Sequence, residues 1–331
     1  MQLKLVLKNT DTPQRTEMLR RFLRTAWNIQ SVDESDAAGL AQALHNADAI
    51  VSMDWSASMP PAPRLRLLHL PGAGTDGIAF AAVPEGASVC NVFEHEIGIA
   101  EYVLATVLEW LIGVRKMDAE LRQGRWRGSW ICGPQHGELF GKTIGIVGYG
   151  RIGREVAKRA SAFGARVIAC NRSKKEPDAH CERIDTMAGF HQLLGESDFV
   201  LLALPLDATS SGLFDQAAFA AMRPTGVVIN VCRGPVVDEE ALYRACRERR
   251  IGGAVIDTWY NYPAPGSDQA VPSRFPMHEL ENIVMTPHAS AWTDALLPRR
   301  CRIIAENLDR LASGQALLNV VAAPRRFELS G

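Results

Sequence analysis

Short apolar runs alternate with segments of helical periodicity along the whole chain. Runs of about four to seven apolar or β-branched residues between polar stretches are typical of strands buried on both faces of a parallel sheet. In the N-terminal part, this pattern predicts strands at 3–7, 49–53, 67–70 and 88–92, with helices near 13–25 and 36–45. We therefore expect one small open α/β sheet in this part of the chain.

The remaining residues repeat the pattern on a larger scale. A long helical pattern at 99–122 is interpreted as the crossing to a second domain. Six apolar runs follow, at 143–147, 166–170, 199–204, 227–231, 253–256 and 283–285. The last helix, at about 295–312, has no strand of its own domain left to cover, so we expect it to return to the first domain. The pattern predicts an α/β protein with two doubly wound parallel-sheet domains.

The composition is that of an ordinary globular protein, with 47% apolar and 22% charged residues among 331. The 36 lysines and arginines balance 37 aspartates and glutamates, and a net charge of −1 supplies no basic field for nucleic acid. The most apolar stretch, 102–114, contains Glu109 and is shorter than the roughly 20 residues of a membrane helix. We therefore expect neither a nucleic-acid partner nor a membrane span.

Two further features bear on the compartment. The N-terminal segment turns polar at Lys8, before a signal-peptide core of sufficient length has formed. The seven cysteines are scattered and none belongs to a C-x-x-C pair, which favours reduced, mostly buried thiols over a zinc site. We expect a cytoplasmic protein with no metal site.

The first candidate site is a glycine-rich turn after the run at 143–147. Gly148, Gly150 and Gly153 form a G-x-G-x-x-G motif between this predicted strand and a helical segment. The first glycine allows a tight turn, the second lets a pyrophosphate approach the backbone, and the third lets helix and strand pack closely. The amides of Arg151 and Ile152, at the helix N-terminus, would hold the anion, so the motif predicts dinucleotide binding. A structural glycine turn is the alternative.

The residues about 20 positions further on indicate which dinucleotide binds. NAD enzymes place an acidic residue here for the ribose hydroxyls, whereas this chain has Asn171, Arg172 and Ser173, followed by Lys174 and Lys175. A guanidinium and a hydroxyl suit the 2′-phosphate of NADP, because charge-assisted bonds to phosphate are among the stronger polar contacts. NADP is therefore predicted as the preferred cofactor over NAD. The alternative is a solvated charged loop.

Two further segments place reactive side chains after predicted strands. Arg233 follows the strand at 227–231 and His288 follows the strand at 283–285, so both are expected at the carboxyl edge of the sheet, where ligands bind. Hydride transfer between a nicotinamide and a 2-hydroxy acid needs a cation to orient the carboxylate and an acid/base to move the proton. Arg233 and His288 are the predicted catalytic residues for these roles. The same edge predicts cofactor contacts from Leu204, Pro205, Val231, Cys232 and His288.

Several segments resemble the D-isomer-specific 2-hydroxyacid dehydrogenase family in order and spacing. They are GIVGYGRIGREVA, INVCRGPVVDEEAL, GGAVIDTW and MTPHASAWT, and PGAGTDGI resembles the substrate-carboxylate loop of the family. The resemblance implies an NAD(P)-dependent reductase of small 2-keto acids and a homodimer formed through the cofactor domains. It also implies a Rossmann cofactor domain at 98–292 and a smaller flavodoxin-like substrate domain formed by 1–97 and 293–331.

The resemblance also implies roles for single residues. Backbone amides near Ala73 and Gly74 would bind the substrate carboxylate, and Asp257 would lie near the nicotinamide end of the cofactor. The stretch RWRGSWICG is similar to one in glyoxylate/hydroxypyruvate reductases, whose tryptophan reaches the active site of the partner subunit. Trp130 is the corresponding residue here, with a core or interface tryptophan as the alternative. Met53 and Trp55, after an early strand, are further candidates for the substrate side.

One position departs from the family pattern. The family places a glutamate five residues after the aspartate, paired with the catalytic histidine, but this chain has Tyr262 at that distance from Asp257. A phenol can orient His288 through a hydrogen bond but brings no full negative charge. Tyr262 is therefore predicted as a member of the catalytic group, and His288 is expected to be less basic than with a glutamate.

Two alternatives stay open. The segments 257–259 and 263–265 resemble formate dehydrogenases, but such an enzyme would have an asparagine where this chain has His95, which leaves formate oxidation a minor alternative. A non-catalytic dinucleotide-binding regulator is the main rival, since related folds can bind a cofactor and act through partners. The missing glutamate favours this rival slightly, whereas the pairing of Arg233 with His288 favours the enzyme.

Overall fold

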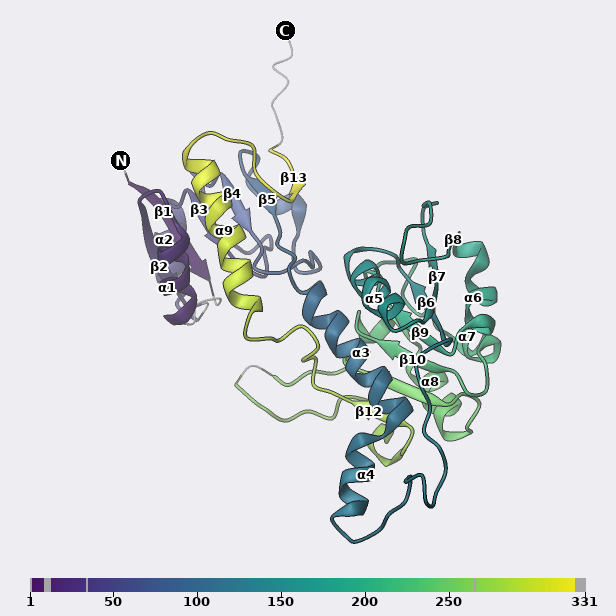
Figure 1. The fold of residues 1–331 in the computed structure, drawn as a ribbon. Helices are drawn as coiled ribbons and strands as arrows, with labels where there is room; N and C mark the ends of the chain where they lie inside the picture. The colour runs from purple at the N-terminus through teal and green to yellow at the C-terminus, as the bar shows by residue number, and fades with distance from the viewer. Residues whose placement is uncertain (1, 9–12, 34, 265, 325–331) are drawn as a thin grey trace. The chain divides into compact units, whose positions relative to one another are not determined.

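The structure is a computed structural model and describes residues 2–8, 13–33, 35–264 and 266–324 (Figure 1). The chain divides into two compact units, one formed by 1–94 with 294–331 and the other by 95–293. The end of the expected first domain, 325–331, and Pro265 of the formate-like segment lie outside the described residues. The functions assigned above to the two domains remain predictions.

The first unit is built on a sheet of six strands in the order β13-β5-β4-β3-β1-β2. All neighbours pair in parallel except β13, which is antiparallel to β5. The strands are β1 (Leu3–Lys8), β2 (Trp27–Val32), β3 (Ala49–Val51), β4 (Leu67–His69), β5 (Ser88–Cys90) and β13 (Val320–Ala322). The helices are α1 (Pro13–Phe22), α2 (Ala37–His45) and α9 (Leu296–Ala312), with a 3₁₀ turn at Phe80–Ala82.

Both faces of this sheet are covered, which explains its nearly continuous apolar strands. Residues of α2, such as Leu44, pack with Ile50 and Leu68 on one face. Residues of α1 and α9, such as Leu19 and Leu308, pack on the other face. The last helix therefore contributes its apolar side to the core of the N-terminal sheet, since that sheet offers the face it needs to cover.

The second unit is built on seven parallel strands in the order β12-β11-β10-β9-β6-β7-β8. The strands are β6 (Thr143–Val147), β7 (Arg166–Asn171), β8 (Arg183–Thr186), β9 (Phe199–Leu202), β10 (Val227–Asn230), β11 (Gly253–Ile256) and β12 (Ile283–Met285). The helices are α3 (Glu96–Ile112), α4 (Val114–Leu121), α5 (Arg151–Ala162), α6 (Phe190–Glu196), α7 (Gln216–Ala221) and α8 (Glu239–Arg247), with 3₁₀ turns at Met187–Gly189, Gly234–Val236 and Met277–Glu279. The order of the strands reverses between β6 and β9, and such a switch point is where ligands bind in open α/β sheets.

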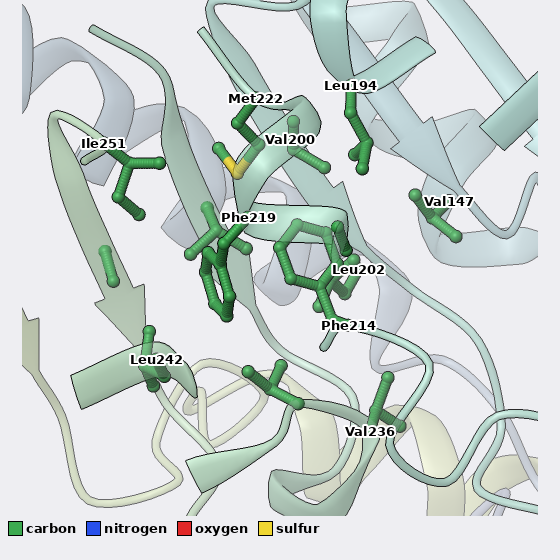
Figure 2. Packing of buried hydrophobic residues seen from close by; sticks show 14 of the residues in the cluster. Val147, Leu194, Val200, Leu202, Phe214, Phe219, Met222, Val236, Leu242 and Ile251 are labelled. Atoms are coloured by element: carbon green, nitrogen blue, oxygen red, sulfur yellow. The ribbon is translucent and has the colours of Figure 1, made fainter. Parts of the chain in front are cut away.

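The core on one face of this sheet contains side chains from the strands and from α6, α7 and α8 (Figure 2). Phe214 lies edge-on to Phe219, with ring centroids 4.8 Å apart, and to Phe190 at 6.0 Å. Such aromatic pairs add about 0.5–1.5 kcal/mol beyond the area they bury. The opposite face is covered by α3 and α5, whose buried residues include Val103 and Val156.

The expected single helix at 99–122 is wrong, because the chain forms two helices. Gly113 has a φ of 70° and ends α3 in the left-handed conformation, and α4 begins at the next residue. Glycine adopts this conformation without the steric cost that a side chain would bring. No single described helix is long and apolar enough to cross a membrane, and α3 and α4 pass that test only as a pair bent by 50°.

Candidate active site

The glycine-rich turn joins β6 to α5, and the backbone explains each of its three glycines. Gly148 has a φ of 99°, and a Cβ there would lie 2.5 Å from the carbonyl oxygen of Ala203. A Cβ on Gly153 would lie 2.7 Å from the carbonyl oxygen of Gly148, so the helix could not approach the strand. At Gly150, by contrast, no described atom lies within 4 Å of the Cβ position. The open space at Gly150, beside the N-terminus of α5, fits a pyrophosphate.

A cavity of about 450 Å³ opens beside this turn, at the carboxyl ends of β6, β7 and β9. It contains predicted cofactor residues from all three strand ends. These are Gly148, Gly150, Asn171, Arg172, Ser173, Leu204 and Pro205. Val231 and Cys232, by contrast, are almost fully buried, and burial raises the pKa of the Cys232 thiol to about 11. The cavity has the size and the mixed polar and apolar lining of a small-molecule site.

Three polar residues of the cavity were not predicted, namely Asp207, Thr209 and Ser210. The Asp207 carboxylate accepts hydrogen bonds from the hydroxyl and the backbone N–H of Thr209, at 2.6 and 2.8 Å. These bonds hold the pKa of Asp207 below its usual value, and the charge of Arg172 lowers it further. The Arg172 guanidinium lies 3.0 Å from the carboxylate. Their signal in the sequence is the largely polar segment from Asp207 to Ser210, which lies shortly after the buried strand β9.

The loop after β7 is bonded to the glycine-rich turn through Tyr149. The buried Tyr149 hydroxyl donates to the Asp178 carboxylate at 2.9 Å, and Lys175 Nζ donates to the Tyr149 carbonyl at 2.7 Å. Burial and the bond to Asp178 raise the pKa of Tyr149. The loop that contains Arg172 and Ser173 is thus held against the turn, while Asn171 bonds the Ser173 hydroxyl at 3.2 Å.

A second group of predicted residues gathers after β10, β11 and β12. Arg233 follows β10, and its guanidinium donates to the Cys232 carbonyl at 2.8 Å. The next residue, Gly234, lets two segments touch, because a Cβ there would lie 2.3 Å from the Trp259 carbonyl oxygen. The Arg233 segment therefore lies directly against the segment that leads to Tyr262.

Asp257 organises the loop that contains His288. Its carboxylate is fully buried and accepts bonds from the Thr286 hydroxyl at 2.5 Å, the Ala289 N–H at 2.8 Å and the Ser290 N–H at 3.0 Å. The Tyr102 hydroxyl adds a bond of 2.7 Å to Thr286. These contacts fix the loop, and His288 itself has a φ of 56°. An unfavourable backbone conformation of this kind persists only where the surroundings enforce it.

His288 and Tyr262 meet directly. The Tyr262 hydroxyl lies 2.9 Å from His288 Nδ1 and accepts the backbone N–H of Trp259 at 3.2 Å. Within the described part of the chain, no carboxylate bonds the imidazole. Partial removal from water lowers the pKa of His288, the Asp257 charge raises it, and the Arg233 charge lowers it. The net effect lowers the pKa of His288, and desolvation is its largest cause.

The predicted carboxylate loop lies in the first unit, after β4. The Val92 N–H donates to the Gly72 carbonyl at 3.2 Å, and Asn91 Nδ2 donates to the Ala73 carbonyl at 2.8 Å. Among the described residues, the backbone N–H groups of Ala73 and Gly74 donate to no acceptor. Two such amides in a fixed turn suit an anion.

The other predicted substrate residues differ in exposure. Met53 is 57% exposed and its Sδ-methyl end lies near Gly72. Trp55 is 2% exposed, belongs to the core of the first unit, and its indole N–H donates to the Ala82 carbonyl at 3.0 Å, which places it in the packing and not on the surface. Trp130 is 96% exposed, on the loop between α4 and β6.

Comparisons with known proteins show the family of this chain. The family described as D-isomer specific 2-hydroxyacid dehydrogenase, NAD binding domain, matches residues 104–290. D-3-phosphoglycerate dehydrogenase of Mycobacterium leprae (strain TN) is 33% identical over 299 residues, which cover 88% of this chain and 54% of that protein. Glyoxylate reductase of Korarchaeum cryptofilum (strain OPF8) is 33% identical over 265 residues, which cover 78% of this chain and 77% of that protein.

A solved structure of a 2-hydroxyacid dehydrogenase from Ketogulonicigenium vulgare Y25 is 25% identical, with a TM-score of 0.81. The structural match covers 98% of this chain and 100% of the chain in that structure. The chain spans about half the length of the D-3-phosphoglycerate dehydrogenases that it matches. By its sequence and its fold, this chain belongs to the D-isomer-specific 2-hydroxyacid dehydrogenase family.

Proposed function

We propose that this chain reduces small 2-keto acids to 2-hydroxy acids with a nicotinamide dinucleotide, in the manner of a glyoxylate/hydroxypyruvate reductase. The observation that carries the proposal is the 2.9 Å contact between Tyr262 and His288, with the charge of Arg233 acting on the same imidazole. An acid/base and a cation thus stand on the sheet that also carries the glycine-rich turn. This combination supports catalysis over cofactor binding alone.

Each group has a separate task in this proposal. Arg233 binds the substrate carboxylate and polarises the carbonyl, and His288 gives a proton to the carbonyl oxygen. The bound nicotinamide supplies the hydride. In the first unit, the amides of Ala73 and Gly74 are the proposed binding groups for a carboxylate, and Met53 is proposed to contact a substrate side chain.

The cofactor in the proposal is NADP in preference to NAD. Gly150 and the amides of Arg151 and Ile152 bind the pyrophosphate, while Arg172 and Ser173 bind the 2′-phosphate. Their position in the lining of the cavity supports this assignment. Asp257 acts near the nicotinamide end by fixing the loop that contains His288.

A homodimer formed through the cofactor domains completes the proposal. The segment between α4 and β6 exposes a group of large apolar side chains, namely Trp126, Trp130, Ile131 and Phe140. Exposed apolar groups of this kind are typical of interaction surfaces. A second copy covers them, and Trp130 reaches the substrate site of that copy.

The test is oxidation of NADPH and NADH with a panel of 2-keto acids that includes glyoxylate, hydroxypyruvate and bulkier members. We expect turnover, preferentially with NADPH, and loss of most turnover in Arg233→Ala and His288→Ala. His278→Ala, an exposed histidine of the same unit, is the matched control and should keep full activity. Cofactor binding without turnover of any 2-keto acid would support the regulator instead, and turnover of formate alone would support the formate alternative.

A further inference from the structure

The hydroxyl of Tyr262 has two neighbours, and their positions favour one direction for its hydrogen bond to His288. The backbone N–H of Trp259 points at the phenolic oxygen from 3.2 Å, and an N–H group can only donate. The oxygen therefore acts as an acceptor toward Trp259. Its own proton is then available to the other neighbour, His288 Nδ1 at 2.9 Å, and we infer that the hydroxyl donates to this nitrogen.

An imidazole nitrogen that accepts a hydrogen bond carries no proton of its own. In neutral imidazole one nitrogen carries the proton and the other is an acceptor. With Nδ1 as the acceptor, the proton lies on Nε2. A glutamate at position 262 would do the opposite, because a carboxylate can only accept and would keep a proton on Nδ1. The phenol therefore reverses the polarity of the contact.

We propose that Tyr262 is a positioning residue that keeps neutral His288 in the Nε2–H form. When Nε2 gives its proton to the substrate, the Tyr262 hydroxyl supplies a proton to Nδ1. The inference deepens the proposed reductase function and rests on it for its catalytic half. The tautomer itself is a property of the free protein.

The proton balance of the step closes without a charged histidine. A bound reduced nicotinamide would supply the hydride that forms the new C–H bond at the carbonyl carbon, so that the ketone is reduced and the nicotinamide oxidised. The carbonyl oxygen takes the proton from Nε2, and the O–H bond of Tyr262 breaks as Nδ1 gains that proton. The phenolate that remains is stabilised by the Trp259 N–H. The Nδ1 proton then returns to it, and water supplies a proton to Nε2, which restores the starting form of both residues.

The surroundings of the imidazole favour this neutral form. The charged groups that act on it are Arg233, after β10, and Asp257, after β11. Asp257 is already bonded to three groups of the loop, and the net effect on the pKa of His288 is downward. Trp259 is itself held, because its indole N–H donates to the Thr286 carbonyl at 2.7 Å. The donor that orients Tyr262 is thus a fixed part of the site.

The first experiment is nitrogen NMR of the ¹⁵N-histidine-labelled protein without cofactor or substrate. The chain has eight histidines, and the His288 signals are those lost in His288→Gln. We expect the Nε2–H tautomer at pH 7.5 in the wild type and an imidazolium in Tyr262→Glu. A wild-type signal from the Nδ1–H tautomer, or from imidazolium, would overturn the proposal whatever the activity of the enzyme.

The second experiment is the pH profile of 2-keto acid reduction. With the Tyr262 hydroxyl and not an imidazolium as the proton source, the wild-type rate should stay flat across the range in which histidine titrates, from about pH 6.5 to 9. In Tyr262→Phe it should fall about tenfold per pH unit above the histidine pKa, and Tyr262→Glu should restore turnover at neutral pH. Tyr260→Phe is the matched control, because the Tyr260 hydroxyl donates to the Val237 carbonyl instead. A wild-type profile in Tyr262→Phe would refute the relay. Absence of any 2-keto acid turnover would refute the proposed function and leave the tautomer to the NMR test.

Discussion

Substitution of Arg172 separates recognition of the 2′-phosphate from recognition of the rest of the dinucleotide. Arg172 lines the cavity beside the glycine-rich turn, and NADPH differs from NADH only by the phosphate that this guanidinium is proposed to bind. Arg172→Ala should therefore weaken NADPH binding and leave NADH binding nearly unchanged. The pyrophosphate contacts proposed for Gly150 and Ile152 would be common to both cofactors.

The structure sets the size of the effect. A hydrogen bond between charged groups contributes about 1.5–3 kcal/mol. The Arg172 side chain is 77% exposed, so solvent screens its charge and the lower end of this range applies. We expect a loss of about 1.5 kcal/mol, roughly tenfold in the Kd for NADPH.

A substitution of Asp207 tests the same prediction in the opposite direction. It holds Arg172 at 3.0 Å and is itself a negative group in the cavity, where it opposes a phosphate. Asp207→Asn should strengthen NADPH binding and leave NADH binding unchanged. The neighbouring exposed cation Lys174, which does not line the cavity, provides the control variant Lys174→Ala.

The assay is titration of each variant with NADPH and NADH, followed by quenching of tryptophan fluorescence, at low and at raised ionic strength. The NADPH preference should shrink as salt screens the contact. Two results would show that this loop is a solvated charged surface and that Arg172 does not bind the phosphate. One is an equal loss of NADPH and NADH affinity in Arg172→Ala, and the other is a loss of NADPH affinity in Lys174→Ala as large as that in Arg172→Ala.

Three further predictions concern stability and assembly. Gly148→Ala should lower the free energy of unfolding by more than about 2 kcal/mol, measured by urea denaturation, because the Cβ would meet a backbone oxygen; Gly212→Ala, at a φ of 64° with open space around it, should cost less. His69 is buried, and burial lowers its pKa to about 4. Because the unfolded chain binds this proton near pH 6.5 and the folded chain does not, stability should fall by about 3 kcal/mol as the pH drops from 6.5 to 4, and a flat urea midpoint over that range would contradict it. Trp130→Ala should change the ranking of 2-keto acids while the Kd for cofactor stays constant; an unchanged ranking in steady-state kinetics would refute its role across the dimer.

Much of the fold can be predicted from the sequence, because buried parallel strands are apolar along their whole length. The runs at 143–147 and 253–256 coincide with β6 and β11 for this reason. The pattern missed β2, β8 and β13, which lie at or near the edges of their sheets and are only partly buried. An edge strand carries no continuous apolar signal, so its pairing is decided by the neighbour it meets in the folded chain.

The glycine-rich turn and the residues Arg233 and His288 were recognisable because their signals are local. A turn needs its glycines at fixed spacings, and a side chain directly after a buried strand must lie at the sheet edge. The sequence alone therefore determined the two-sheet α/β class, the family and the strand ends at which the candidate site residues lie.

Only the tertiary structure decided which side chains meet across that edge. The pairs Arg172–Asp207, Thr286–Asp257 and Tyr262–His288 join residues 26 to 35 positions apart. Spacings of this length have no fixed geometry in a chain, because the intervening loops set where each side chain ends. The Trp259 N–H that points at the Tyr262 oxygen is a backbone group, so its role cannot be predicted from the type of residue at this position. Its position follows from the strand order and the close approach at Gly234, which exist only once the sheet has formed.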